Sequence, residues 1–348
     1  MGDEPYTPDT PMRRPSIPLE IIIEITGKCR LVCPYCTGPR TADVPLKDIK
    51  ATLDEAASMG IKAVRITGGE PLIHPDIQTI LTYAKTKKFA ILLNTAAEGI
   101  SPRLMKTIIS TVDVALVSLQ GHNEKANSVY TRSRLPFLDK IKNIFLLKAY
   151  LPTLWIATVI TPTMAQSIKK FVPLIKKINP AAWTLLRPIS DMNEDLKQMD
   201  IVFYREFALR ILEIRRENIN AFIANPIPLC ITGDLKTGKE VFFGANFDDG
   251  HVRIVRSAQG FYKPSYFIET NLGSTIKAAW DHPFLQELNS NDFLPDLCQR
   301  CPVLDICRGG CRSMALRTLG TALAQDPLFD PLSAQKALSM SLPTKRRP

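Results

Sequence analysis

Short apolar runs alternate with amphipathic stretches along most of the chain. Continuous apolar runs are typical of strands that are covered on both faces, and the stretches between them have helical spacing. The expected strands cover residues 19–25, 61–67, 89–94, 112–119, 154–160 and 182–187. The expected helices cover residues 45–59, 76–87, 102–110, 136–149, 165–177 and 201–217. Six strand–helix repeats predict an α/β fold, in which a parallel sheet is surrounded by helices.

The alternation stops near residue 219. Residues 239–243 and 251–255 flank Asp248-Asp249-Gly250, which predicts a β-hairpin, and a helical stretch is expected near 275–288. Proline and polar residues before the first strand predict a mobile arm. The expected domains are the arm 1–18, an α/β barrel 19–218, a small α+β domain 219–330 and a tail 331–348.

Composition narrows the class of protein. Eight cysteines in 348 residues are too few for a disulfide scaffold, and their clustering indicates metal binding in a reducing compartment, hence the cytoplasm. We expect no membrane span and no secretory signal. The net charge of +10 favours a solvated basic surface, with attraction to an acidic partner as the alternative. The basic segments lack interleaved aromatic residues, so no nucleic-acid partner is expected.

Three cysteines follow the first expected strand with the spacing CxxxCxxC. Cys29, Cys33 and Cys36 can hold three corners of a [4Fe–4S] cluster. A complete cage needs four ligands, so one iron would remain open to a small molecule. The alternative is a zinc site that is completed by His74 or by another thiol.

The second expected strand ends in Gly68-Gly69-Glu70. Glycines let backbone approach a ligand closely, and the Glu70 carboxylate can accept a hydrogen bond from a ligand ammonium. By itself this sequence is an ordinary turn. Placed one strand–helix unit after CxxxCxxC, it resembles the GGE motif of the radical S-adenosylmethionine (radical SAM) enzymes.

The resemblance implies an open barrel of six units, a partial (β/α)6 TIM-like barrel. It also implies that the open iron binds SAM, that the reduced cluster cleaves SAM to a 5′-deoxyadenosyl radical, and that Glu70 holds the SAM amino group. Other polar residues fall at expected strand ends, where reactive groups collect in such folds. The predicted cofactor-binding residues are Tyr35, Gly68, Gly69, Glu70, Asn94, Ser118, Gln120 and Arg187. For Ser118 and Gln120, the capping of a turn is the alternative.

A second group of cysteines has the spacing CxxC-x5-C-x3-C. Cys298, Cys301, Cys307 and Cys311 can encircle a [4Fe–4S] cluster or a zinc ion. The stretch resembles the SPASM domain, which follows the barrel in many radical SAM enzymes that modify peptides. A full SPASM domain has seven cysteines and two auxiliary clusters. Here two of the expected positions hold Val255 and Phe329, which favours a reduced or twitch form with one auxiliary cluster.

The fourth ligand of that auxiliary cluster stays open between two thiols. Cys311 is favoured by its proximity in sequence, and Cys230 is the alternative. If Cys311 is the ligand, Cys230 is either a buried structural thiol or a hydrogen-atom donor to a substrate radical.

The resemblance favours a radical SAM maturase that modifies a ribosomally made precursor peptide, with SAM and two [4Fe–4S] clusters as cofactors. Crosslinking, epimerisation and backbone excision all stay open. An external electron donor is expected, and a separate leader-recognition protein is expected because only about 18 residues precede the first strand. The alternatives are propionate decarboxylation of a haem precursor and a non-enzymatic zinc or redox protein.

Overall fold

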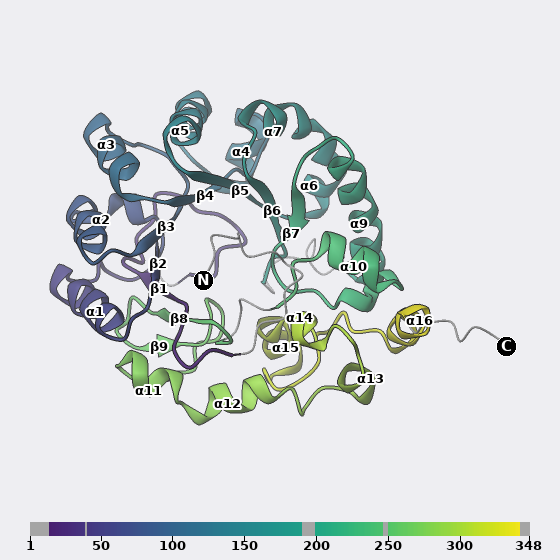
Figure 1. Cartoon of the computed structure of the whole chain (residues 1–348). Helices are drawn as coiled ribbons and strands as arrows, with labels where there is room; N and C mark the ends of the chain where they lie inside the picture. The colour runs from purple at the N-terminus through teal and green to yellow at the C-terminus, as the bar shows by residue number, and fades with distance from the viewer. Residues whose placement is uncertain (1–13, 39, 190–198, 246–249, 342–348) are drawn as a thin grey trace.

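The chain folds around one curved, mostly parallel sheet. The computed structural model describes residues 14–38, 40–189, 199–245 and 250–341. Its nine strands have the order β7-β6-β5-β4-β3-β2-β1-β8-β9. Figure 1 shows the strands as an arc with helices α1 to α7 and α9 along its outer side. The predicted α/β barrel architecture is confirmed.

All six expected strands are present, within a few residues of their predicted ends. They are β1 (Glu20–Glu24), β2 (Ala63–Thr67), β3 (Ala90–Thr95), β4 (Val114–Ser118), β5 (Thr153–Val159) and β6 (Ala182–Leu186). The helices that cover them are α1 (Leu46–Ser58), α2 (Ile77–Thr86), α3 (Pro102–Thr111), α4 (Glu124–Thr131), α5 (Phe137–Tyr150), α6 (Pro162–Ser167), α7 (Val172–Ile178) and α9 (Ile201–Arg215). Helix α4, which the apolar pattern missed, is capped by Asn123, whose side chain accepts a hydrogen bond from Ala126 N.

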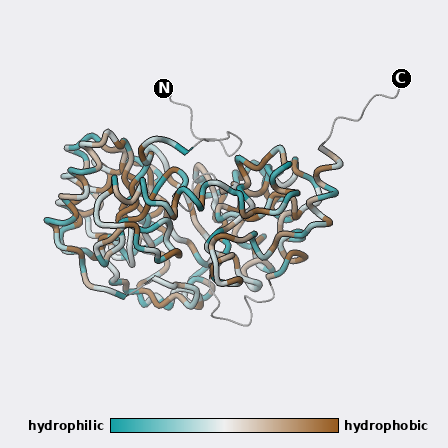
Figure 2. The backbone as a smooth tube through the Cα atoms, turned by 90° about the horizontal axis from the view of Figure 1, so that it is seen from below, coloured by the Kyte–Doolittle hydropathy of each residue, from teal (hydrophilic) through white to brown (hydrophobic). Residues whose placement is uncertain are grey.

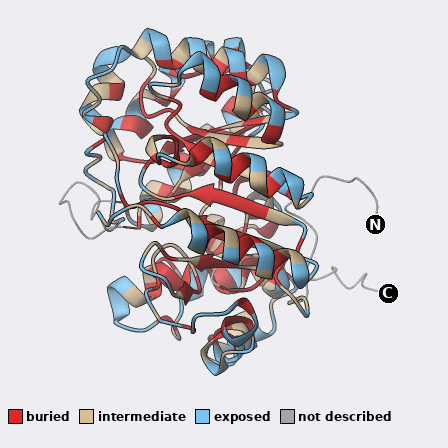
Figure 3. Cartoon of the chain, turned by 90° about the vertical axis from the view of Figure 1, so that its left-hand side faces the viewer, coloured by how far each residue is buried: buried red, intermediate tan, exposed pale blue. Residues whose placement is uncertain are grey.

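The two faces of the sheet are covered differently. Strand β4 alternates between half-buried and buried residues, and its buried residues Ala115 and Val117 belong to the core beneath the helices. The half-buried residues, such as Leu116, lie on the opposite face, since successive side chains of a strand point to opposite sides. In β4 only the outer face is therefore fully covered, whereas β1, β2, β6 and β7 have consecutive buried residues, as expected for strands that are covered on both faces. Figure 3 shows the buried strands and the buried inner sides of the helices.

The sheet continues past the predicted domain boundary near residue 218. Strand β7 (Ala221–Ile223) pairs with β6, while β8 (Arg253–Arg256) pairs in parallel with β1. Strand β9 (Tyr262–Lys263) then pairs antiparallel with β8. The barrel sheet thus takes strands from the region that was predicted as a separate domain.

The predicted hairpin over 239–255 is wrong. Its first arm lies mostly in helix α10 (Leu235–Val241), which Asp234 caps by accepting hydrogen bonds from Lys236 N and Thr237 N. Its second arm becomes β8. Of the expected turn, Asp248 and Asp249 lie outside the described residues, and Gly250 has a φ of 75°. A local cap and pairing with β1 override the apolar pattern.

Short helices follow the sheet and lie on the side of the molecule opposite α3, α5 and α7 (Figure 1). They are η3 (Leu229–Thr232), α11 (Ile276–Trp280), α12 (Pro283–Ser290), α13 (Asp296–Gln299), α14 (Leu304–Cys307), α15 (Arg312–Leu319) and α16 (Pro331–Ser341). The expected helix near 275–288 is present as α11 and α12. Helix α16 occupies part of the expected tail, and residues 342–348 lie outside the described part.

The expected mobile arm is packed where it is described. Arg14 lies 4.1 Å from the centre of the Trp280 ring and donates a hydrogen bond to Trp280 O at 2.5 Å. Trp280 Nε1 in turn donates to Pro15 O at 3.1 Å. Residues 1–13 lie outside the described part. The sequence missed this anchor because Trp280 is 265 positions from Pro15.

Apolar and polar segments alternate along the described part of the backbone, as Figure 2 shows. Within the described ranges, no helix combines the length and the hydropathy that a membrane span requires.

A buried ion pair joins the barrel to the C-terminal segment. Arg187, just after β6, donates hydrogen bonds from both terminal nitrogens to Asp326, at 2.6 and 3.1 Å. Asp326 is 0% exposed and also accepts from Cys311 N and Leu328 N, each at 2.8 Å. Charge-assisted, bidentate pairs of this kind are the stronger class of hydrogen bond. The pair fixes residues 311–328 against the end of β6.

Replacing Asp326 tests this connection. Asp326→Ala leaves the buried Arg187 guanidinium unpaired, and we expect the free energy of unfolding to fall by about 3–5 kcal/mol. Urea unfolding under anaerobic conditions measures the change. The control is Asp139→Ala, which removes the Lys142–Asp139 pair, whose side chains are 64% and 59% exposed. It should cost less than about 1 kcal/mol, and equal losses in the two variants would contradict the assigned role of Asp326.

Candidate functional site

The cysteine loop between β1 and α1 is anchored by backbone contacts to the end of β2. Gly69 N donates to Thr26 O at 2.7 Å, and Glu70 N donates to Lys28 O at 2.8 Å. A Cβ at Gly68 would lie 2.2 Å from Thr26 O, and one at Gly69 would lie 2.1 Å from Lys28 O. The two glycines therefore let one backbone approach another. Their direct partner in the structure is the turn that leads into Cys29, whereas the sequence suggested a ligand.

The three thiols of this loop lie close enough for their charges to interact. Cys29 and Cys36 both raise the pKa of Cys33, although burial is the largest cause and brings that pKa to about 11. A hydrogen bond with the Tyr35 side chain lowers the pKa of Cys33 and so opposes the effect of burial. Cys29 Sγ accepts a hydrogen bond from Leu31 N at 3.4 Å. Because burial disfavours the free thiolates of Cys29 and Cys33, a positive metal centre that compensates their charge would stabilise them.

The zinc alternative requires ligands that are arranged around a single ion. In the described part of the chain, no three His, Cys, Asp or Glu side chains are arranged to hold a single metal ion. In a [4Fe–4S] cluster each thiolate binds its own iron, so the sulfurs stand apart around the cluster. His74, the suggested zinc ligand, is 3% exposed and uses both ring nitrogens, Nε2 with Val44 O and Nδ1 with Asp76 N. The zinc site with His74 is therefore not supported.

Glu70 lies buried at the end of β2 with its carboxylate already oriented. Oε1 accepts from Leu72 N at 3.1 Å and from Thr95 Oγ1 at 2.7 Å, and Oε2 accepts from Ala96 N at 2.7 Å. Burial raises the pKa of Glu70 despite these hydrogen bonds. A carboxylate has about four lone-pair positions, so Oε2 retains room for one more donor. A ligand ammonium there would stabilise the ionised form.

A buried lysine beside this site was missed by the sequence reading. Lys140 of α5 is 1% exposed, and its Nζ lies 3.3 Å from Glu98 Oε1. Burial lowers the pKa of Lys140, while Glu98, Glu70 and Cys33 act in the opposite direction. Its position on the face of α5 that carries Ile144 and Leu147 was the available signal, since a lysine seldom occupies an apolar stripe.

The other predicted residues have partners within the protein. Asn94 lies on the inner face of β3, accepts from Arg65 Nη1 at 3.0 Å and donates to Tyr266 OH at 3.3 Å. Gln120 Oε1 accepts from Val159 N at 2.9 Å and so ties the end of β4 to β5. Ser118 ends β4 and is half-buried.

Arg187 also has a partner within the protein. It was predicted to bind the cofactor, but it is 3% exposed and pairs with Asp326. It also donates a hydrogen bond to Pro226 O at 3.2 Å. The structure thus gives Arg187 a connecting role between β6 and the C-terminal segment. The sequence could not show this, because its partner is 139 residues away.

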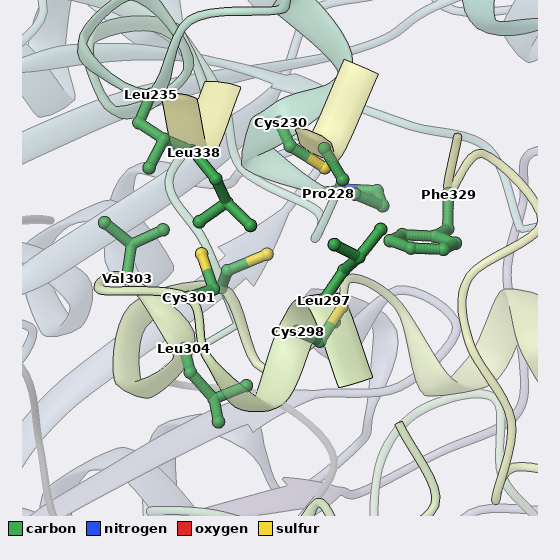
Figure 4. Close-up of a pocket in the computed structure, with 13 residues that line it drawn as sticks. Pro228, Cys230, Leu235, Leu297, Cys298, Cys301, Val303, Leu304, Phe329 and Leu338 are labelled. Atoms are coloured by element: carbon green, nitrogen blue, oxygen red, sulfur yellow. The ribbon is translucent and has the colours of Figure 1, made fainter. Parts of the chain in front are cut away.

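A second group of thiols lines one apolar cavity, which we call the C-terminal cysteine cavity. Its thiols are Cys230, Cys298, Cys301 and Cys307, and its other lining residues are Pro228, Leu235, Leu297, Val303, Leu304, Gly309, Phe329, Ala334 and Leu338. Figure 4 shows Cys230, Cys298 and Cys301 around this cavity, together with Leu338 and other apolar side chains. Cys311, which the sequence favoured as a ligand, is not among the lining residues.

Residues 23–172 match the family model described as the Radical SAM superfamily. This part of the chain is therefore a radical SAM domain, and the protein is an enzyme of that class. The resemblance drawn from CxxxCxxC and Gly-Gly-Glu is confirmed, and with it the use of SAM and an iron–sulfur cluster.

Curated relatives span almost the whole chain. The PqqA peptide cyclase of Methylorubrum extorquens is 24% identical over 91% of this chain and 87% of its own length. The PqqA peptide cyclase of Xanthomonas oryzae pv. oryzae is 23% identical over 90% of this chain and 88% of its own length.

Two solved structures share the fold. Streptococcus suis SuiB bound to its precursor peptide SuiA has a TM-score of 0.73 and 19% identity, covering 90% of this chain and 76% of SuiB. The structure of anSMEcpe with bound AdoMet has a TM-score of 0.72 and 15% identity, covering 92% of this chain and 96% of that protein. The likeness extends beyond the barrel into the C-terminal region.

The steric requirement at Gly69 gives a test of how the cysteine loop is positioned. Gly69→Ala places a methyl group against Lys28 O and should displace the turn that enters Cys29, so the reconstituted protein should lose most of the iron bound by that loop. Iron and sulfide analysis after anaerobic reconstitution measures this loss. Gly38→Ala is the matched control, because its Cβ would lie at an ordinary 3.7 Å from Cys36 Sγ. Full iron content in Gly69→Ala would show that the close backbone approach is not required.

Proposed function

We propose that this radical SAM enzyme modifies a precursor peptide. The observation that carries the proposal is the joint position of the cysteine loop and the buried, oriented Glu70 carboxylate at the ends of β1 and β2. The curated relatives are named as peptide cyclases, and SuiB was solved with a precursor peptide. These names favour a peptide over the haem precursor. Crosslinking, epimerisation and excision stay open.

Each group at the site has a proposed task. Cys29, Cys33 and Cys36 would hold three irons and leave the fourth for SAM, and Glu70 would accept a hydrogen bond from the SAM ammonium. When bound there, the cluster and SAM supply the 5′-deoxyadenosyl radical that removes a hydrogen atom from the substrate. Lys140 lies near Glu70 and Cys33 and would balance the negative charge of the site.

Further groups complete the proposal. Tyr35 would lie near the adenine, with its hydroxyl group against Cys33. Asn94 and Ser118 would line the inner face of the sheet near the cofactor. The second cysteine group would hold one auxiliary [4Fe–4S] cluster, with Cys298, Cys301 and Cys307 as ligands. An external electron donor would reduce the clusters, and the separate leader-recognition protein expected from the sequence stays a prediction.

The proposed reaction has a direct test. The anaerobically reconstituted protein with SAM and dithionite should release 5′-deoxyadenosine, and the triple variant Cys29→Ala, Cys33→Ala, Cys36→Ala should release none above background. Chromatography with mass detection measures the nucleoside. Candidate peptides encoded beside its gene are then added, and their masses are followed in water and in heavy water.

The change in peptide mass separates the possible reactions. Loss of hydrogen atoms indicates a crosslink, uptake of one deuterium indicates epimerisation, and loss of a larger fragment indicates excision. Decarboxylation of a porphyrin precursor, with every peptide unchanged, would contradict the proposal. Wild-type protein that releases no 5′-deoxyadenosine under these conditions would also contradict it.

The role of Glu70 has a test of its own. Glu70→Gln keeps the shape of the side chain but removes its charge, so SAM affinity should fall by roughly 10- to 100-fold, the equivalent of about 1.5–3 kcal/mol. Equilibrium dialysis with labelled SAM measures the dissociation constant, and iron content should stay unchanged. Glu213→Gln, a half-exposed carboxylate on α9, is the control. Equal affinity in Glu70→Gln and wild type would remove Glu70 from the SAM site.

A further inference from the structure

The C-terminal cysteine cavity brings together thiols that are far apart in the sequence. Cys230 comes from η3, just after β7, whereas Cys298 lies on α13 and Cys307 ends α14. Cys307, Cys298 and Cys301 all raise the pKa of Cys230 electrostatically, although burial is the larger cause. All four thiols therefore surround one space.

Cys311 lies elsewhere. It is 1% exposed, and its backbone N donates to Asp326 Oδ2 at 2.8 Å. Its thiol raises the pKa values of Arg187 and Tyr204 electrostatically. The Cys311 thiol therefore lies near the buried ion pair. Asp326 thus holds the backbone at Cys311 beside the end of β6.

Backbone groups already point toward one of the cavity thiols. Cys307 Sγ accepts a hydrogen bond at 3.4 Å from the backbone N of Leu229, the residue that precedes Cys230. The backbone groups of Gly309 and Gly310 also lower the pKa of Cys307, against the dominant effect of burial. Hydrogen bonds of this kind to cysteine sulfur are among the factors that tune iron–sulfur clusters. The hydrogen bond from Leu229 therefore holds the η3 segment, which carries Cys230, against Cys307.

Phe329 explains why an upstream thiol is needed. The resemblance to the SPASM pattern places the last expected cysteine at this position, and Phe329 does line the cavity. A phenyl ring cannot ligate iron. The cavity nevertheless contains a fourth sulfur, and that sulfur belongs to Cys230.

We propose that Cys230, together with Cys298, Cys301 and Cys307, forms the complete ligand set of the auxiliary [4Fe–4S] cluster, and that Cys311 is not a ligand. This inference rests on the auxiliary cluster of the proposed function and identifies its ligands. It replaces the prediction that Cys230 is a spare hydrogen-atom donor. Four thiolates leave no iron open to a substrate.

The lid of this site is apolar. Ala334 and Leu338 of α16 line the cavity together with Leu235 of α10. Helix α16 also contacts η3, the segment that carries Cys230. Such a lid limits the access of water to a bound cluster, and solvent exposure is one of the factors that set its reduction potential.

The test counts iron in a background that retains only the auxiliary site. The full-length protein carrying Cys29→Ala, Cys33→Ala and Cys36→Ala should hold about four irons and four sulfides after reconstitution. Adding Cys230→Ala should reduce this to about three irons or fewer, with the electron paramagnetic resonance (EPR) signal of a three-iron cluster after oxidation. Adding Cys311→Ala instead should leave iron content and the EPR spectrum unchanged.

A conservative variant separates ligation from folding. Cys230→Ser retains an oxygen that can bind iron, so it should keep about four irons while shifting the EPR spectrum of the reduced cluster. Circular dichroism checks that each variant is folded. An unchanged cluster in Cys230→Ala, or an equal loss in Cys311→Ala, would overturn the assignment.

The proposed function can be distinguished from this assignment. If the wild type releases 5′-deoxyadenosine and modifies a peptide while Cys230→Ala keeps its auxiliary cluster, only the ligand assignment fails. If the background protein binds no iron although the wild type is active, both the auxiliary cluster and this ligand set fail, and the radical reaction at the first cysteine loop stands.

Discussion

The close approach of two backbones, at Thr26–Lys28 and Gly68–Glu70, is the constraint on which the candidate site depends. Two hydrogen bonds hold these segments together, and any Cβ at Gly68 or Gly69 would lie within about 2.2 Å of a carbonyl oxygen. These two hydrogen bonds fix both the start of the cysteine loop and the backbone of Glu70. A proposed metal site and a proposed ligand site thereby share one rigid connection.

The C-terminal region is positioned by a second connection, the buried pair of Arg187 and Asp326. This pair lies between the end of β6 and the segment that contains Cys311, and it places that thiol away from the cavity lined by Cys230. The sheet also crosses between the two regions, because β8 pairs with β1. The barrel and the cysteine-rich region thus form one folded unit rather than two linked domains.

The polar groups on the inner face of the sheet form a charged network near the proposed cofactor site. Arg65 binds Glu20 at 2.8 Å and Asn94 at 3.0 Å, and Asn94 extends the network to Tyr266. Burial would raise the pKa of Glu20, but Arg65 and Arg253 more than offset this effect and lower it. The inner face is therefore polar and ionised where a substrate would meet the sheet, whereas the outer face is apolar.

The sequence by itself determined the six central strands, most of their helices and the radical SAM class. The periodicity of apolar residues indicates which residues are buried. Cys29, Cys33 and Cys36, and likewise Gly68-Gly69-Glu70, lie within short segments, so each motif can be recognised without knowledge of distant contacts. Tertiary structure alone decided the pairing of β8 with β1, the partner of Arg187, the burial of Lys140 and the thiols that share the C-terminal cavity. Each of these depends on contacts between segments far apart in the chain, such as Cys230 with Cys307, and the order of residues does not specify which distant segments meet.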